Sequence, residues 1–143
     1  MKQEENKNNN QMEQSQQELM FKLSYFEQHM NQIQQQLRAV EQAILEMGDL
    51  NLGLEELKGK TGTEIMAPIG RGIFVKAKLA SEELTVDIGN RNLVKKSIED
   101  TRKLISEQVD KLHQAKHELN NNLEQINSEM ESLVLSSQKM LSQ

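Results

Sequence analysis

The sequence predicts an α+β chain that is mainly helical: a long antiparallel coiled-coil hairpin with two β-hairpins at the helix junction. Two segments of about 45 residues each carry apolar residues at helical spacing, and the segment between them changes to a period of two. Only 3% of the 143 residues are aromatic and none is Trp, so an elongated protein is expected rather than a compact globule. One structural domain accommodates these segments.

The first predicted helix covers residues 12–58. Its apolar residues form a seam with alternating spacings of four and three after Leu19, which is typical of a coiled coil. The spacing continues through Leu57, although Gly48 and Gly53 each cost about 1 kcal/mol relative to Ala, and a kink is expected near Gly48. Lys58 and Gly59 then resemble a helix terminus. Residues 1–11, rich in Asn, Gln and Glu, are predicted to be a disordered tail.

Residues 63–96 are predicted to form two β-hairpins that serve as an assembly module. Apolar residues alternate with other residues here, which gives each short strand one apolar face. Glycines mark the turns, and Pro68 fits only an edge or a bulge because it cannot donate to a ladder. Such small sheets are marginal alone, so their apolar faces and edges should pair with another subunit. The residues expected to make this contact are Ile65, Ile69, Ile73, Val75, Leu79, Leu84, Val86 and Ile88.

The second predicted helix covers residues 97–143. Ser97 resembles an N-cap, followed by the first-turn carboxylates Glu99 and Asp100. A second apolar seam follows, interrupted at Arg102, where a polar residue costs stability but fixes register. Since the hairpins join two helices of matched length, antiparallel pairing within the chain closes both seams.

The end of the helical hairpin farthest from the strands carries apolar residues beyond the seam. Such groups, rimmed by polar residues, usually mark a binding surface, and Met and Phe suit one that accepts varied partners. Alternatively, these residues cap the coiled coil, or the end frays. The residues expected to bind are Met20, Phe21, Tyr25, Leu133, Val134, Leu135, Met140 and Leu141.

The strand region resembles the prefoldin family, and specifically its alpha-type subunits, which have two hairpins between the helices. The matching motifs are EIMAPIGRGIFVKAKL at 64–79, VDIGN at 86–90 and LVKKSIED at 93–100. The resemblance implies a hexamer of two alpha-type and four beta-type subunits, in which the β-hairpins form a platform for six coiled coils. It also implies a cytoplasmic, ATP-independent holdase that captures unfolded proteins at the coiled-coil tips and delivers them to a group II chaperonin.

Other function classes find little support in the sequence. A formal net charge of −5 argues against nucleic-acid or anionic-membrane partners. His113 and His117 lie four residues apart, but they lack the further ligands of a metal site, and no phosphate-binding glycine motif is present. We therefore expect neither an enzyme nor a cofactor. The alternative function is a structural or tethering coiled coil that binds one defined partner through the same end.

Overall fold

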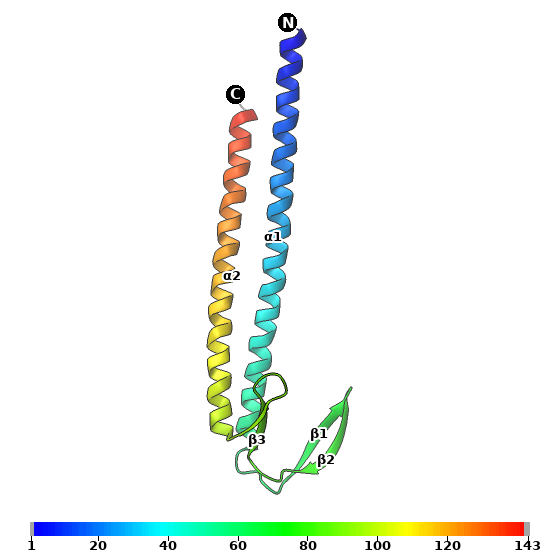
Figure 1. The fold of residues 1–143 in the computed structure, drawn as a ribbon, viewed down its shortest axis with the longest axis vertical. Coiled ribbons are helices and arrows are strands. Elements are labelled where there is room, and N and C mark those ends of the chain that lie inside the picture. Colours follow the sequence, from blue (N-terminus) through cyan, green and yellow to red (C-terminus); the bar gives the residue numbers. More distant parts are fainter. Residues whose placement is uncertain (1, 142–143) are drawn as a thin grey trace. The chain divides into compact units, whose positions relative to one another are not determined.

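The computed structural model describes residues 2–141, without the side chains of Met140 and Leu141. Two helices, α1 (Lys2–Leu57) and α2 (Ile98–Leu141), are separated in the sequence by four strands. The strands are β1 (Glu64–Gly70), β2 (Ile73–Lys78), β3 (Leu84–Asp87) and β4 (Leu93–Lys96). The predicted fold class, two long helices with two small β-hairpins between them, is thus confirmed (Figure 1).

The chain divides into two compact units. The terminal unit combines Met1–Glu41 with Ala115–Gln143, and the hairpin unit is Gln42–Gln114. In the terminal unit, Glu41 of α1 and Lys116 of α2 form an ion pair of 3.6 Å between carboxylate oxygen and Nζ. In the hairpin unit, Leu54 of α1 packs with Ile98 of α2. Each unit therefore contains a segment of both helices.

Helix α1 begins earlier than the sequence indicated. It starts at Lys2, whereas residues 1–11 were expected to be disordered and the helix to start at Met12. Gln, Glu and Lys are good helix formers, and extending an existing helix adds one hydrogen bond per residue without a new nucleus. The segment contains no Gly or Pro, so nothing in it stops that extension.

Helix α1 also passes through both of its glycines. Gly48 and Gly53 lie within the helix, which ends at Leu57, one residue before the end of the predicted range. Gly59 follows with a φ of 73°, a left-handed conformation in which glycine is favoured over residues with a Cβ. Burial of the neighbouring seam offsets the roughly 1 kcal/mol cost of each helical glycine.

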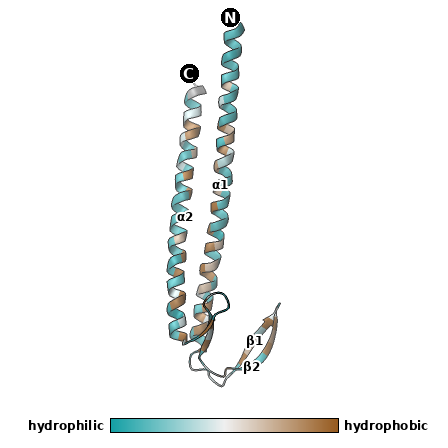
Figure 2. Ribbon diagram, viewed as in Figure 1, coloured by the Kyte–Doolittle hydropathy of each residue, from teal (hydrophilic) through white to brown (hydrophobic). Residues whose placement is uncertain are grey.

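The predicted seams form the apolar contact between the helices. Ile33 and Ile126 are buried in the terminal unit. In the hairpin unit, Leu54, Ile98 and Ile105 form a buried cluster against which Met47, Leu57, Leu84 and Val109 pack. Teal, hydrophilic residues dominate the N-terminal part of α1, whereas brown residues are frequent in β1 and β2 (Figure 2). A narrow two-helix seam therefore supplies most of the core.

A polar layer interrupts the seam in the hairpin unit. Arg102 Nε donates to Asn51 Oδ1 at 2.9 Å, and the same guanidinium is ion-paired with Glu55. Arg102 is part-buried, so these partners satisfy a group that would otherwise lose hydration. Only one alignment of the two helices places Arg102 beside both partners, as expected of a polar residue that fixes register.

Replacing Arg102 with Ala should lower the free energy of unfolding by about 1–2 kcal/mol. The change removes charge-assisted hydrogen bonds and leaves the part-buried Asn51 amide without its partner. Thermal unfolding followed by circular dichroism measures the loss. Lys103→Ala, on the exposed neighbouring residue, is the matched control. Equal stability of the two variants would show that the polar layer contributes nothing.

The strands form two separate two-stranded sheets, β1–β2 and β3–β4. In the first, Ile65 is opposite Ala77 and Ala67 is opposite Val75, so these side chains share one face. The register shifts between Pro68 and Gly70, which leaves Ile69 at a bulge and confirms the prediction for Pro68. In the second sheet, Val86 pairs with Val94 and Leu84 pairs with Lys96.

Tight turns close both hairpins. Arg71 between β1 and β2 has a φ of 49°, and Asn90 and Arg91 between β3 and β4 have φ values of 51° and 61°. The Asp87 carboxylate accepts a hydrogen bond of 2.8 Å from the backbone N–H of Gly89, which holds the second turn.

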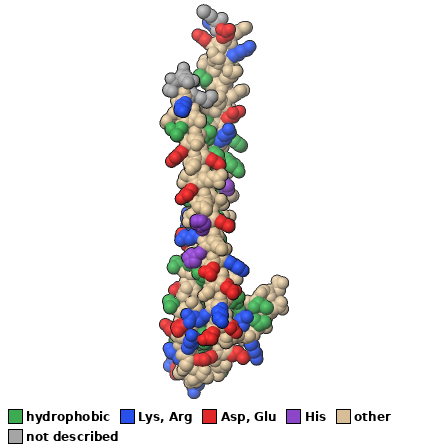
Figure 3. Space-filling view, turned by 90° about the vertical axis from the view of Figure 1, so that its left-hand side faces the viewer, with side chains coloured by type: hydrophobic (Ala, Val, Ile, Leu, Met, Phe, Trp, Pro, Cys, Tyr) green, Lys and Arg blue, Asp and Glu red, His purple; other side chains and the backbone are tan. Residues whose placement is uncertain are grey.

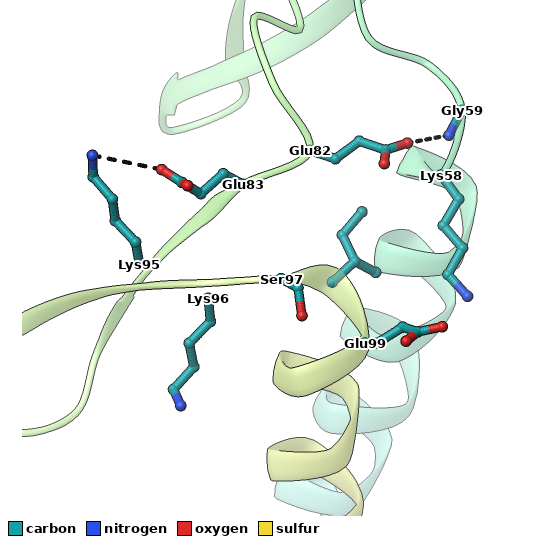
Figure 4. A pocket seen from close by; sticks show the side chains of 9 residues that line it. Lys58, Gly59, Glu82, Glu83, Lys95, Lys96, Ser97 and Glu99 are labelled. Atoms are coloured by element: carbon teal, nitrogen blue, oxygen red, sulfur yellow. Dashed lines mark hydrogen bonds and ion pairs between the residues drawn. The ribbon is translucent and has the colours of Figure 1, made fainter.

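Side chains fasten the hairpins to the helix ends. The Glu82 carboxylate accepts a hydrogen bond from the backbone N–H of Gly59, just beyond α1 (Figure 4). Within the second hairpin, Lys95 Nζ of β4 lies 3.6 Å from a carboxylate oxygen of Glu83, just before β3. Ser97 Oγ accepts from the backbone N–H of Asp100 at 3.1 Å, which confirms the predicted N-cap of α2.

Candidate functional site

The first candidate site is the tip cluster, which comprises exposed apolar residues of both helices in the terminal unit. Phe21 is 79% exposed, and Val134, the least exposed member, is 39% exposed. Hydrophobic side chains (green) are visible among polar and charged ones in the upper helical region of Figure 3. The members of the cluster are Met20, Phe21, Tyr25, Val134 and Leu135.

A groove lies beside the tip cluster, between the two helices. Met12 and Leu19 of α1 and Leu133 of α2 supply its apolar lining, and Ser136 and Ser137 are among its polar groups. Met12 is exposed although its spacing assigns it to the seam, while Leu19 and Leu133 are half-buried. The two helices therefore do not fully cover the seam around Met12 and Leu19, and the apolar side chains of the seam border the groove.

Geometry distinguishes the members of the predicted binding end. Phe26 is half-buried beside the exposed Tyr25, with ring centroids 5.9 Å apart in an edge-to-face arrangement. Leu133 points into the groove rather than lying fully on the surface. The side chains of Met140 and Leu141, also expected to bind, lie outside the described residues. The cluster can offer apolar and aromatic contact to a partner.

The second candidate site is the set of strand residues expected to contact another subunit. Ile69, Ile73, Val75 and Ile88 are exposed apolar side chains. Ile65, Leu79, Leu84 and Val86 are half-buried. Leu84 packs against the core cluster of the helices, so part of its surface already has a partner within the chain. Exposed apolar residues are thus concentrated in the β1–β2 hairpin.

Comparison with known proteins assigns the chain to a family. The model of the prefoldin subunit family matches residues 26–139, which include the second half of α1, all four strands and most of α2. The chain belongs to the prefoldin family. Members of this family are chaperone subunits, and prefoldin alpha subunits form oligomeric complexes with other prefoldin subunits.

Curated relatives include prefoldin alpha subunits of several organisms. The alpha subunit of Methanobrevibacter smithii is 31% identical over 117 residues, covering 81% of this chain and 80% of the relative. That of Methanosphaera stadtmanae is 34% identical over 97 residues, covering 63% of this chain and 69% of the relative. The Thermofilum pendens alpha subunit is 26% identical over 117 residues, covering 80% and 91%.

A solved structure supports the fold. The cryo-EM structure of a filamentous PFD from Methanocaldococcus jannaschii superposes with a TM-score of 0.70. The match covers 77% of this chain and 93% of that chain at 17% sequence identity. At this low identity it shows similarity of fold and nothing further. The described helices and hairpins are therefore those of a prefoldin.

Sequence reasoning missed several exposed apolar residues of this prefoldin chain. Leu45 and Leu52 lie off the seam of α1, and their spacing of seven residues was the available signal. Met66 and Phe74 lie on the face of the β1–β2 hairpin opposite the residues expected to contact another subunit. Leu50, assigned to the seam by spacing, is also exposed.

Other kinds of site are not apparent within residues 2–141. That part of the chain contains no group of three or more His, Cys, Asp or Glu side chains placed to hold a metal ion. Neither helix, over its described length, is apolar enough to cross a lipid bilayer.

Proposed function

We propose that this prefoldin chain is a subunit of an ATP-independent holdase that captures unfolded proteins at its tip cluster. The observation that carries the proposal is the exposure of Phe21 and its apolar neighbours on both helices, next to a groove with an apolar lining. Unfolded chains differ from native ones chiefly in the apolar side chains that they expose to water. A surface of Met, Phe, Val and Leu recognises that property without requiring a defined sequence.

The β-hairpins are proposed to assemble the chain into a hexamer. Ile73 and Val75 expose apolar surface on a two-stranded sheet with free edges, and such a sheet is marginal by itself. Pairing with other hairpins would cover both the apolar face and the edges. We propose two copies of this alpha-type chain with four beta-type subunits, in the cytoplasm, with delivery of the captured protein to a group II chaperonin.

Capture is tested by the aggregation of several unrelated denatured proteins, measured by light scattering with the assembled complex and without nucleotide. We expect delayed aggregation of each substrate at stoichiometric complex. If the complex protects none of these substrates but binds one native partner tightly, the tethering function is favoured and the holdase proposal is overturned. Delivery is tested separately by adding group II chaperonin with ATP, which should raise the yield of folded client.

A further inference from the structure

A second apolar surface lies on α1, within the hairpin unit and away from the tip cluster. Leu45 is 64% exposed and Leu52 is 67% exposed. Seven residues separate them, so they share one face of the helix. Leu54, which is buried against α2, is nine residues from Leu45 and therefore about half a turn away. The pair thus lies on the side of α1 opposite the seam, and we call it the outer stripe.

The outer stripe is strongly acidic. Between Arg38 and Lys58, α1 has five acidic residues and no basic one, and two of the five, Glu41 and Glu55, are ion-paired with α2. Asp49 follows Leu45 by four residues and Glu56 follows Leu52 by four, which places both carboxylates beside the leucines. Gly48 lies between the leucines, and apart from its chain neighbours and the helix's own backbone no atom comes within 4 Å of the place where its Cβ would be. The stripe is therefore two apolar side chains with a gap between them and carboxylates alongside.

The β1–β2 hairpin carries a surface of matching character. Pro68 pairs with Phe74 and Met66 pairs with Lys76, so these four side chains share the face opposite Val75. Met66 and Phe74 are exposed. Lys78, opposite Glu64 on this same face, adds a second ammonium group, and Lys76 Nζ lies 3.8 Å from a Glu64 carboxylate oxygen. The face is apolar toward the turn and mainly basic toward the strand ends.

We propose that the outer stripe of α1 binds the Met66–Phe74 face of the β1–β2 hairpin from a second copy of this chain. Apolar contact would bring Phe74 and Met66 onto Leu45 and Leu52, with Lys76 and Lys78 beside Asp49 and Glu56. Opposite charges around an apolar centre fix orientation and disfavour other partners. Both surfaces are exposed within a single chain, so each is available to another copy. The contact leaves the opposite hairpin face, with Ile73 and Val75, for the assembly proposed above.

Cysteine cross-linking tests the contact directly, because the chain contains no native cysteine. A Leu52→Cys chain and a Phe74→Cys chain with tags of different length are mixed, assembled with beta-type subunits and oxidised. We expect a disulfide-linked dimer containing one chain of each kind. Thr85→Cys, on an exposed residue of β3 outside the proposed contact, is the control and should give several-fold less of the mixed dimer with Leu52→Cys.

Charge reversal provides a second measurement. Two charge-reversed chains are made. One carries Asp49→Lys and Glu56→Lys, and the other carries Lys76→Glu and Lys78→Glu. Each reversed chain should associate with the unaltered chain about tenfold more weakly. Mixing the two reversed chains should restore association, because the pairs are opposite again. Sedimentation velocity measures both effects without reference to client binding, so the result is independent of the holdase proposal.

Two outcomes would overturn the proposal. One is the absence of mixed dimer above the Thr85→Cys control. The other is a cross-link that forms only within a single chain carrying both Leu52→Cys and Phe74→Cys, which would mean that the hairpin folds back on its own helix.

Discussion

Replacing Met20, Phe21, Val134 and Leu135 with Ser should abolish the suppression of aggregation while leaving assembly intact. Each exposed apolar side chain contributes roughly 1 kcal/mol when a client covers it, since only part of its surface becomes buried. Four losses of this size amount to about 4 kcal/mol, or nearly a thousandfold in affinity. Because all four side chains are exposed, their removal costs the coiled coil little.

Light scattering with several denatured proteins measures this loss. The matched control replaces Gln32, Gln36, Asn121 and Glu124, four exposed polar residues elsewhere on the same helices, with Ser. The control should protect clients as the unaltered chain does. Undiminished protection by the tip variant would assign these residues to capping the coiled coil, the alternative that the sequence left open.

The second large effect is expected at the hairpins. Ile73→Asp with Val75→Asp places two carboxylates on the exposed apolar face of β2. Burial of an unpaired charge in an interface costs several kcal/mol, so assembly with beta-type subunits should fail. The free chain should retain its helical circular dichroism, because the seam of α1 and α2 lies elsewhere.

Native mass spectrometry with the beta-type partner distinguishes the expected results. The unaltered chain should give a particle of two alpha-type and four beta-type subunits, and the variant should give only smaller species. Thr85→Asp, on an exposed residue of β3, is the control and should assemble. A full-sized particle from the Ile73→Asp, Val75→Asp variant would exclude this face from the interface.

Periodicity predicted most of the fold because burial in this chain follows simple repeats. Ile33, Leu54, Ile105 and Ile126 occupy seam positions and are buried, and the period-two segments became the hairpins. Pro68 marked the bulge correctly because its missing N–H restricts where it can lie. These features depend on local chemistry, which the sequence shows directly.

Features that depend on longer-range context were harder to predict. Composition suggested a disordered start, yet α1 begins at Lys2 because a helix can extend through polar residues once it has formed. The packing of Leu84 against the helices follows from tertiary contacts. At the candidate site, Phe21 and Leu135 were identifiable as off-seam residues, whereas the groove beside them required the pairing of the helices.

The most direct test of client capture places a photoreactive probe next to the tip cluster. Gln17→Cys lies one helical turn from Phe21, and Gln36→Cys lies on an exposed polar stretch of the same helix. Each cysteine is labelled with benzophenone, and the assembled complex is illuminated with a denatured client. Strong cross-linking from position 17 and little from position 36 is the predicted result. Equal cross-linking from both positions, or none from position 17, would contradict capture at the tip.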